Sequence, residues 1–60
     1  MQPAYAIHDD IGTYVGTIIP QDSNVRIFET GGFDMCRQYT VNYDEKDQGD
    51  VITKLIKQMI

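Results

Sequence analysis

The spacing of apolar residues along the chain changes once, close to Gly49. From Asp50 to Ile60 the apolar residues recur at i, i+3, i+4 and i+7, which is typical of an amphipathic helix with one buried face. Asp50 is the expected N-cap, because its carboxylate can accept from the free N–H groups of the first turn, and Gly49 ends whatever precedes it. Such a short helix is not stable alone in water, so it must form by packing on the rest of the chain.

Before this helix the apolar residues follow a period of two and are interrupted by turn residues, which indicates short strands. The predicted strands are Tyr5–His8, Thr13–Ile19, Val25–Thr30 and, approximately, Arg37–Tyr43. The expected fold is therefore α+β: an antiparallel four-stranded meander with one C-terminal helix packed on one face (ββββα). Residues 1–60 are expected to form this single small domain.

Two registers are open for the third and fourth strands. A tight turn at Gly31-Gly32 would place Glu29 opposite Asp34, and like charges across a strand pair are unfavourable. A slip of three positions places Glu29 opposite Arg37 and stacks apolar residues on one face, so we favour it. Residues 31–36 then form a loop, while in the tight-turn alternative part of this segment belongs to the fourth strand.

Charge and cysteine content narrow the classes of function. Nine acidic residues against five basic ones give a formal charge of -4, which argues against direct binding to nucleic acid or to an anionic membrane. A protein partner with a basic surface fits better, although this charge also serves to keep a small protein in solution. The single Cys36 excludes an internal disulfide, and no apolar run reaches the length of a signal or membrane segment. These features predict a cytoplasmic protein.

Candidate catalytic and metal-binding groups are incomplete. His8-Asp9-Asp10 is the only cluster with metal-capable side chains, and no further ligands complete a coordination shell. Cys36 has no histidine placed within reach, and Ser23 stands in a turn without a base. The acidic residues between 44 and 50 lack the ligand order of an EF-hand loop. The sequence therefore predicts a protein that is not an enzyme and has no cofactor or metal.

Two short segments resemble known families. The first hairpin is similar to that of the HicB antitoxin family in Tyr5–Asp10, Gly12, Tyr14 and Pro20. That resemblance implies a helix soon after the third strand, whereas this chain continues with TGGFDMCRQYTVNY, which has the pattern of loop and strand. Gln21-Asp22-Ser23 is similar to the short acid-serine element of phage uracil-DNA glycosylase inhibitors, which act as DNA mimics. We assign the chain to neither family.

The first hypothesis for function is a non-catalytic protein-binding module. It would be a small acidic inhibitor of the phage or mobile-element type, in a finer version a DNA mimic, that occludes a basic or nucleic-acid-binding surface of its partner. The residues expected to bind the partner are Phe33, Asp34 and Met35 in the loop, with Glu29, Asp22, Asp44, Glu45 and Asp47 supplying charge.

The alternative hypothesis is a homodimeric structural or regulatory module, such as an antitoxin-like protein. A helix about 10 Å wide covers roughly two strands of one sheet face, so apolar residues are left on the other face. The predicted dimer face consists of Tyr14, Ile18 and Phe28.

Overall fold

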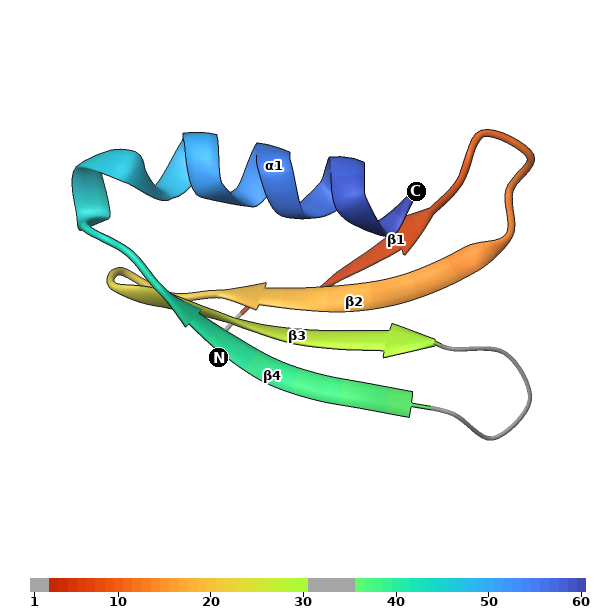
Figure 1. The fold of residues 1–60 in the computed structure, drawn as a ribbon, viewed down its shortest axis with the longest axis horizontal. Helices are drawn as coiled ribbons and strands as arrows, with labels where there is room; N and C mark the ends of the chain where they lie inside the picture. Colours follow the sequence, from red (N-terminus) through yellow and green to blue (C-terminus); the bar gives the residue numbers. More distant parts are fainter. Residues whose placement is uncertain (1–2, 31–35) are drawn as a thin grey trace.

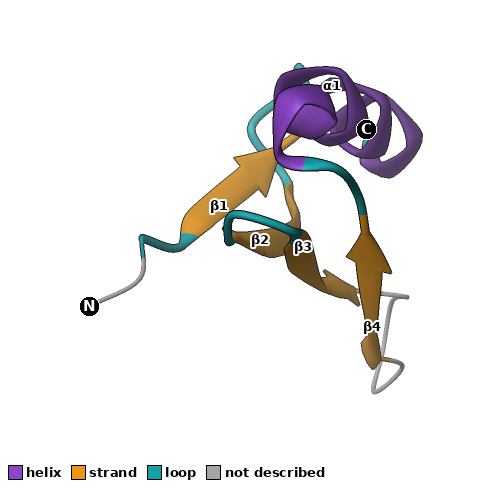
Figure 2. Cartoon of the chain, turned by 90° about the vertical axis from the view of Figure 1, so that its left-hand side faces the viewer, coloured by secondary structure: helices purple, strands orange, loops and turns teal. Residues whose placement is uncertain are grey.

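The computed structural model describes residues 3–30 and 36–60. The strands are β1 (Tyr5–His8), β2 (Tyr14–Pro20), β3 (Asn24–Thr30) and β4 (Cys36–Asn42), followed by a 3₁₀ turn, η1 (Glu45–Asp47), and the helix α1 (Gln48–Met59) (Figure 1). The strands pair in chain order as one antiparallel sheet, and α1 lies across one of its faces (Figure 2). This confirms the predicted α+β meander. Within the described ranges, no helix has the length and apolar character needed to cross a membrane.

The β1–β2 hairpin is shaped by Asp9 and Gly12. The Asp9 Oδ1 accepts the backbone N–H groups of Ile11 (3.1 Å) and Thr13 (2.8 Å), which is the usual way in which an aspartate stabilises a turn. Gly12 has a φ of 87°, a conformation that residues with a Cβ rarely adopt. The metal-capable aspartate of the sequence thus has a structural role in the turn.

A β-bulge lies within β2, near the start of the strand. Ile7 pairs with Gly16 while His8 pairs with Tyr14, so Val15 is an extra residue without a partner on β1. The bulge turns the side chain of Tyr14 to the sheet face opposite α1. There its hydroxyl contacts Thr17 Oγ1, and its ring meets the His8 ring edge-on, with 5.7 Å between the centroids.

The core lies between the central strands and the helix. Ile18, Val25 and Ile27 are between 0% and 2% exposed, and Leu55 of α1 packs against them. Ile18 and Ile27 are directly paired across β2 and β3, which places both side chains on the face under α1. The helical stripe is therefore used for packing, as the sequence predicts.

The pairing of β3 with β4 confirms the favoured register. Glu29 lies opposite Arg37, and Ile27 lies opposite Tyr39. Thr30 pairs with Cys36, so β4 begins one residue earlier than predicted. Residues 31–35 lie outside the described part of the chain.

The predicted start of the helix is wrong. The N–H of Asp47 donates to the carbonyl of Asp44 (2.8 Å), so helical turns begin in η1, and α1 itself starts at Gln48 rather than at Asp50. Asp47 occupies the N-cap position without a side-chain capping bond, and Asp50 lies in the first turn, where its negative charge favours the helix dipole. Gly49 does not break the helix, because tertiary packing of the turns on either side outweighs its low helix propensity.

Candidate partner-binding site

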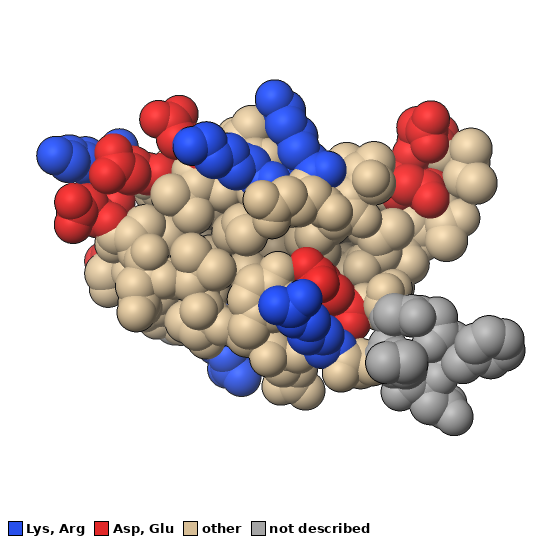
Figure 3. All heavy atoms as spheres, viewed as in Figure 1, with Lys and Arg blue, Asp and Glu red and all other residues tan. Residues whose placement is uncertain are grey.

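Four of the predicted partner-binding carboxylates gather at one end of the molecule. Asp22 lies in the turn between β2 and β3, while Asp44, Glu45 and Asp47 lie in the connection from β4 to α1. We name these four residues the acidic end. Figure 3 shows acidic side chains clustered where α1 begins, beside a basic side chain, and Lys46 of η1 belongs to this region. Asp22, Asp44 and Glu45 are exposed and Asp47 is half-buried.

Hydrogen bonds from Tyr43 and Gln48 hold the two segments of the acidic end together. The Tyr43 hydroxyl donates to the carbonyls of Gln21 and Asn24, the latter at 2.8 Å. The Tyr43 N–H donates to the carbonyl of Ser23 (3.0 Å), and Gln48 Nε2 donates to that of Gln21 (3.1 Å). Asp22 is thereby fixed next to the start of the helix. This role of Tyr43 is not predicted by the sequence, in which the only signal is its position after the last strand and next to the acidic loop.

Glu29 does not join the acidic end. It lies five positions along β3 from Asn24, which at about 3.3 Å per residue corresponds to about 17 Å. The Tyr39 hydroxyl donates to Glu29 Oε1 (2.6 Å), and the Arg37 guanidinium carbon is 4.7 Å from the centroid of the Tyr39 ring. Burial, followed by the hydrogen bond and the charge of Glu29, raises the pKa of Tyr39, while Arg37 lowers it. The Glu29 carboxylate is thus hydrogen-bonded to a side chain of the neighbouring strand. The predicted loop residues Phe33, Asp34 and Met35 lie outside the described residues.

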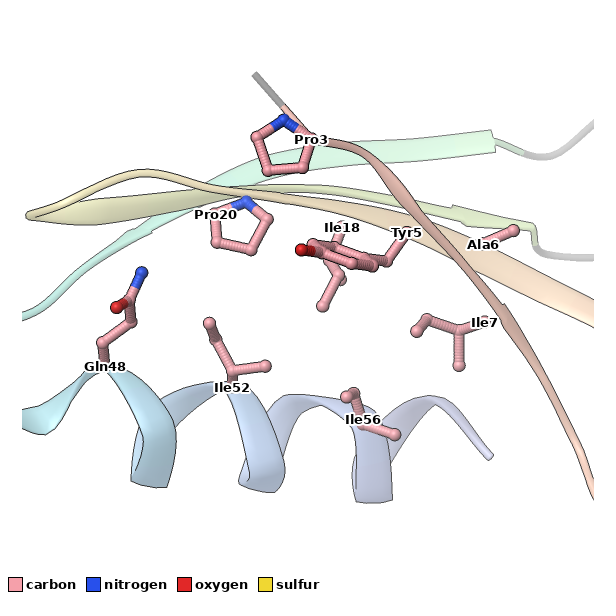
Figure 4. Close-up of a pocket in the computed structure, with 9 residues that line it drawn as sticks. All are labelled: Pro3, Tyr5, Ala6, Ile7, Ile18, Pro20, Gln48, Ile52 and Ile56. Carbon is pink, nitrogen blue, oxygen red and sulfur yellow. The ribbon is translucent and has the colours of Figure 1, made fainter. Parts of the chain in front are cut away.

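An apolar groove of 570 Å³ opens between β1 and α1. The residues that line it are Pro3, Tyr5, Ala6, Ile7, Ile18, Pro20, Gln48, Ile52 and Ile56 (Figure 4). Among the described residues of this lining, only Gln48 and Tyr5 carry polar side-chain groups. The volume lies within the range of ligand-binding sites in proteins, roughly 300–1,000 Å³.

The groove exists because the helix is narrower than the sheet. α1 packs on β2 and β3, and Figure 2 shows the start of β1 lying away from it. In Figure 4 Ile52 and Ile56 point from α1 toward Tyr5 and Ile18 of the sheet. Pro20 and Gln48 line the groove where it meets the acidic end. The site was not predicted from the sequence, although the expected two-strand coverage by a helix already implied that an outer strand would be left without a cover.

The predicted dimer face is wrong in one of its residues. Ile18 is only 2% exposed and lies under α1, whereas Tyr14 and Phe28 lie on the uncovered face. The bulge places Ile18 on the face opposite Tyr14, and the pairing of Ile18 with Ile27 places it on the face opposite Phe28. The Arg26 guanidinium carbon is 5.5 Å from the centroid of the Phe28 ring, and Tyr14 is 43% exposed. The uncovered face is therefore a mixture of polar and apolar side chains.

The described residues offer little for metal binding. Among residues 3–30 and 36–60, no group of three His, Cys, Asp or Glu side chains is arranged to hold a metal ion. The Cys36 thiol is exposed at the start of β4. No protein-family model, curated protein or solved structure matches the chain.

Proposed function

We propose that the chain is a non-catalytic protein-binding module, a small inhibitor that places its acidic end on a basic surface of a partner protein. The observation that supports this most is the way in which Tyr43 and Gln48 hold carboxylates from two separate segments at one end of the molecule. Because the backbone on both sides of Asp22 is already fixed in the free protein, its carboxylate loses less conformational entropy when the partner binds. A disordered acidic loop would not have this advantage.

The groove beside the acidic end supplies the apolar part of the interface. Protein interfaces concentrate their affinity in a few apolar anchors that fill pockets, while charges at the rim govern association rate and specificity. The acidic end and the groove meet at Pro20 and Gln48, so one partner surface can engage both. In the finer version of the proposal the partner's basic surface is its nucleic-acid site, and the carboxylates take the place of phosphates.

Affinity capture followed by reconstitution tests the proposal. The wild-type protein is immobilised, proteins are captured from a lysate of the source cells, and the captured partner is purified. A variant with Asp22→Asn, Asp44→Asn, Glu45→Gln and Asp47→Asn is expected to weaken the Kd at least about tenfold at low salt, and less at high salt, because screening already reduces the charge interaction. Asp10→Asn, which removes an exposed carboxylate from the β1–β2 turn, is the control and should leave the Kd unchanged. An equal Kd for the wild type and the four-residue variant would reject the acidic end as the binding surface.

A further inference from the structure

The two outer strands of the sheet present different edges. Within the part of the chain that the structure describes, β1 and β4 each pair with one neighbour only, so each has an edge without a hydrogen-bonded partner strand. β4 carries Arg37, and charged residues on an edge protect it from pairing with other chains. β1, with the sequence YAIH, contains no Asp, Glu, Lys, Arg or proline. The edge of β1 is therefore the less protected of the two.

β1 also carries an exposed apolar side chain on its groove side. Four large apolar residues are exposed in the described part of the chain: Tyr5 (52%) in β1, Ile11 (83%) in the turn after it, Tyr14 (43%) at the start of β2 and Ile60 (59%) after α1. Of these, Tyr5 lines the groove. The groove shares its wall with this strand, because Tyr5 and Ile7 line it opposite Ile52 and Ile56. An unpaired edge and an apolar groove therefore lie side by side.

We infer that the groove binds an extended segment of a partner protein, which adds to the sheet as a fifth strand along the edge of β1. This rests on the proposed protein-binding function and specifies how the partner is held. In an antiparallel pair alternate residues direct both N–H and C=O to the same neighbour, so half of the residues of β1 direct theirs away from β2. An added strand satisfies these groups, and every second side chain of that strand enters the groove.

Charge defines the sequence of this segment. None of the described residues that line the groove is charged, and its end at Pro20 and Gln48 adjoins the acidic end. The segment therefore carries aliphatic residues at alternate positions, with Lys or Arg at the end that lies over Pro20. A second copy of this chain fits less well, because antiparallel pairing of two β1 strands brings the acidic end of one copy toward Asp9 and Asp10 of the other.

The test uses a defined probe, the peptide Thr-Val-Thr-Ile-Thr-Lys-Lys with blocked ends, and the full chain labelled with ¹⁵N. Pro20 lies beside the N-terminal end of β1, so the C-terminal lysines of a strand antiparallel to β1 reach it. Binding is followed through the backbone amide resonances of β1 and α1. Two isomers of the peptide are compared, one N-methylated at the two aliphatic residues and the other at the two threonines that follow them. Because only alternate N–H groups of an added strand face β1, one isomer is expected to bind at least about tenfold more weakly than the unmodified peptide, and the other within a factor of about three.

A pair of tyrosine variants locates the peptide. Tyr5→Ala is expected to weaken binding about tenfold, whereas Tyr14→Ala, which removes a similarly exposed tyrosine away from the groove, should leave it unchanged. Equal binding of both methylated isomers overturns the inference, as does the absence of resonance shifts in β1 at about 1 mM peptide. Protection of β1 amides that grows with protein concentration alone also overturns it, since a second copy is then the occupant. None of these outcomes contradicts the proposed function, because that function is tested separately by the variant in which the acidic end is neutralised.

Discussion

Gly16 and Gly49 allow the same substitution, glycine to alanine, to be made at two sites with opposite expected effects. Gly16 lies in β2 and is buried. A Cβ at this position would overlap the carbonyl oxygen of Phe28 and the Cε of Met59, and would lie 3.3 Å from the Cα of Glu29. At Gly49, in the first turn of α1, a Cβ would meet no atom within 4 Å.

The magnitude of the loss at Gly16 follows from what can move. Met59 Cε is the end of a flexible side chain and can turn away, whereas the Phe28 carbonyl belongs to the strand paired with β2 and can move only if β2 and β3 separate. Overpacking costs typically about 1–3 kcal/mol, and a weakened ladder hydrogen bond adds about 1 kcal/mol. The expected destabilisation is about 3 kcal/mol, a large part of the roughly 3–9 kcal/mol that a chain of this length has in total. Gly49→Ala is expected to stabilise by about 0.5–1 kcal/mol through helix propensity.

Urea unfolding followed by far-UV circular dichroism measures both effects. With a slope of about 1 kcal/mol per molar urea, Gly16→Ala lowers the midpoint by about 3 M or leaves the chain unfolded, and Gly49→Ala raises it by about 0.5–1 M. The double variant Gly16→Ala with Met59→Ala should not regain the stability of Met59→Ala alone, because the clash with Phe28 remains. A Gly16→Ala midpoint within about 0.5 M of the wild type would refute the close approach of β2 and β3 at this position.

Three further predictions concern the hydrogen bonds. Tyr43→Phe is expected to lower the free energy of unfolding by about 1–2 kcal/mol in the same assay, since it removes the hydroxyl donor that the Gln21 and Asn24 carbonyls share. Tyr5→Phe, which removes a hydroxyl from an exposed side chain, should change it little. Because the pKa of Tyr39 is raised in the folded state, its contribution to stability is fully present below about pH 10 and is lost as pH rises through the folded pKa. Tyr39→Phe should therefore flatten the decline of the urea midpoint above pH 10, and an unchanged decline would contradict the raised pKa. Asp9→Ala removes the acceptor of two turn N–H groups and is expected to cost about 1–2 kcal/mol, with Asp10→Ala as the neutral control.

The strands and the helix could be predicted from the sequence because each shows one regular spacing of apolar residues. The period of two placed the strands to within about one residue, and opposite charges at Glu29 and Arg37 selected the register that the structure has. The start of α1 was missed because the polar residues before Asp50 look like a loop in the sequence. In the folded chain the Gln48 side chain donates a hydrogen bond to the Gln21 carbonyl. This tertiary contact is made by the first residue of α1 and is not visible in the local sequence.

The candidate site could not be predicted from local sequence patterns, because it depends on which distant residues the fold brings together. The prediction of Tyr14 and Ile18 on one face assumed strict alternation, and the extra residue Val15 between them reversed it. The association of Asp22 with Asp47 depends on Tyr43 reaching across to Gln21, a pairing of residues far apart in the sequence. Composition alone identified the charge but could not say which carboxylates would share a surface.

The size of the chain links the fold to the proposed binding mode. A domain of this length has one helix with which to cover a four-stranded sheet, and α1 contributes Leu55 to a core formed by the central strands. Ile52 and Ile56 lie at the margin of that core. Beyond them the sheet continues into β1, whose start lies away from α1 (Figure 2), and the groove opens between the two. Filling the groove from within would require a further element or larger side chains on β1. Because one helix covers only part of the sheet, apolar side chains are left exposed in the groove beside the unpaired edge of β1. A partner segment that fills the groove should therefore stabilise the fold as it binds.

The urea midpoint of unfolding should then rise in the presence of the probe peptide. Above the Kd, it should rise in proportion to the logarithm of the peptide concentration. The Tyr5→Ala variant should lose this dependence, and a midpoint independent of peptide in the wild type would show that the groove is not the place of binding.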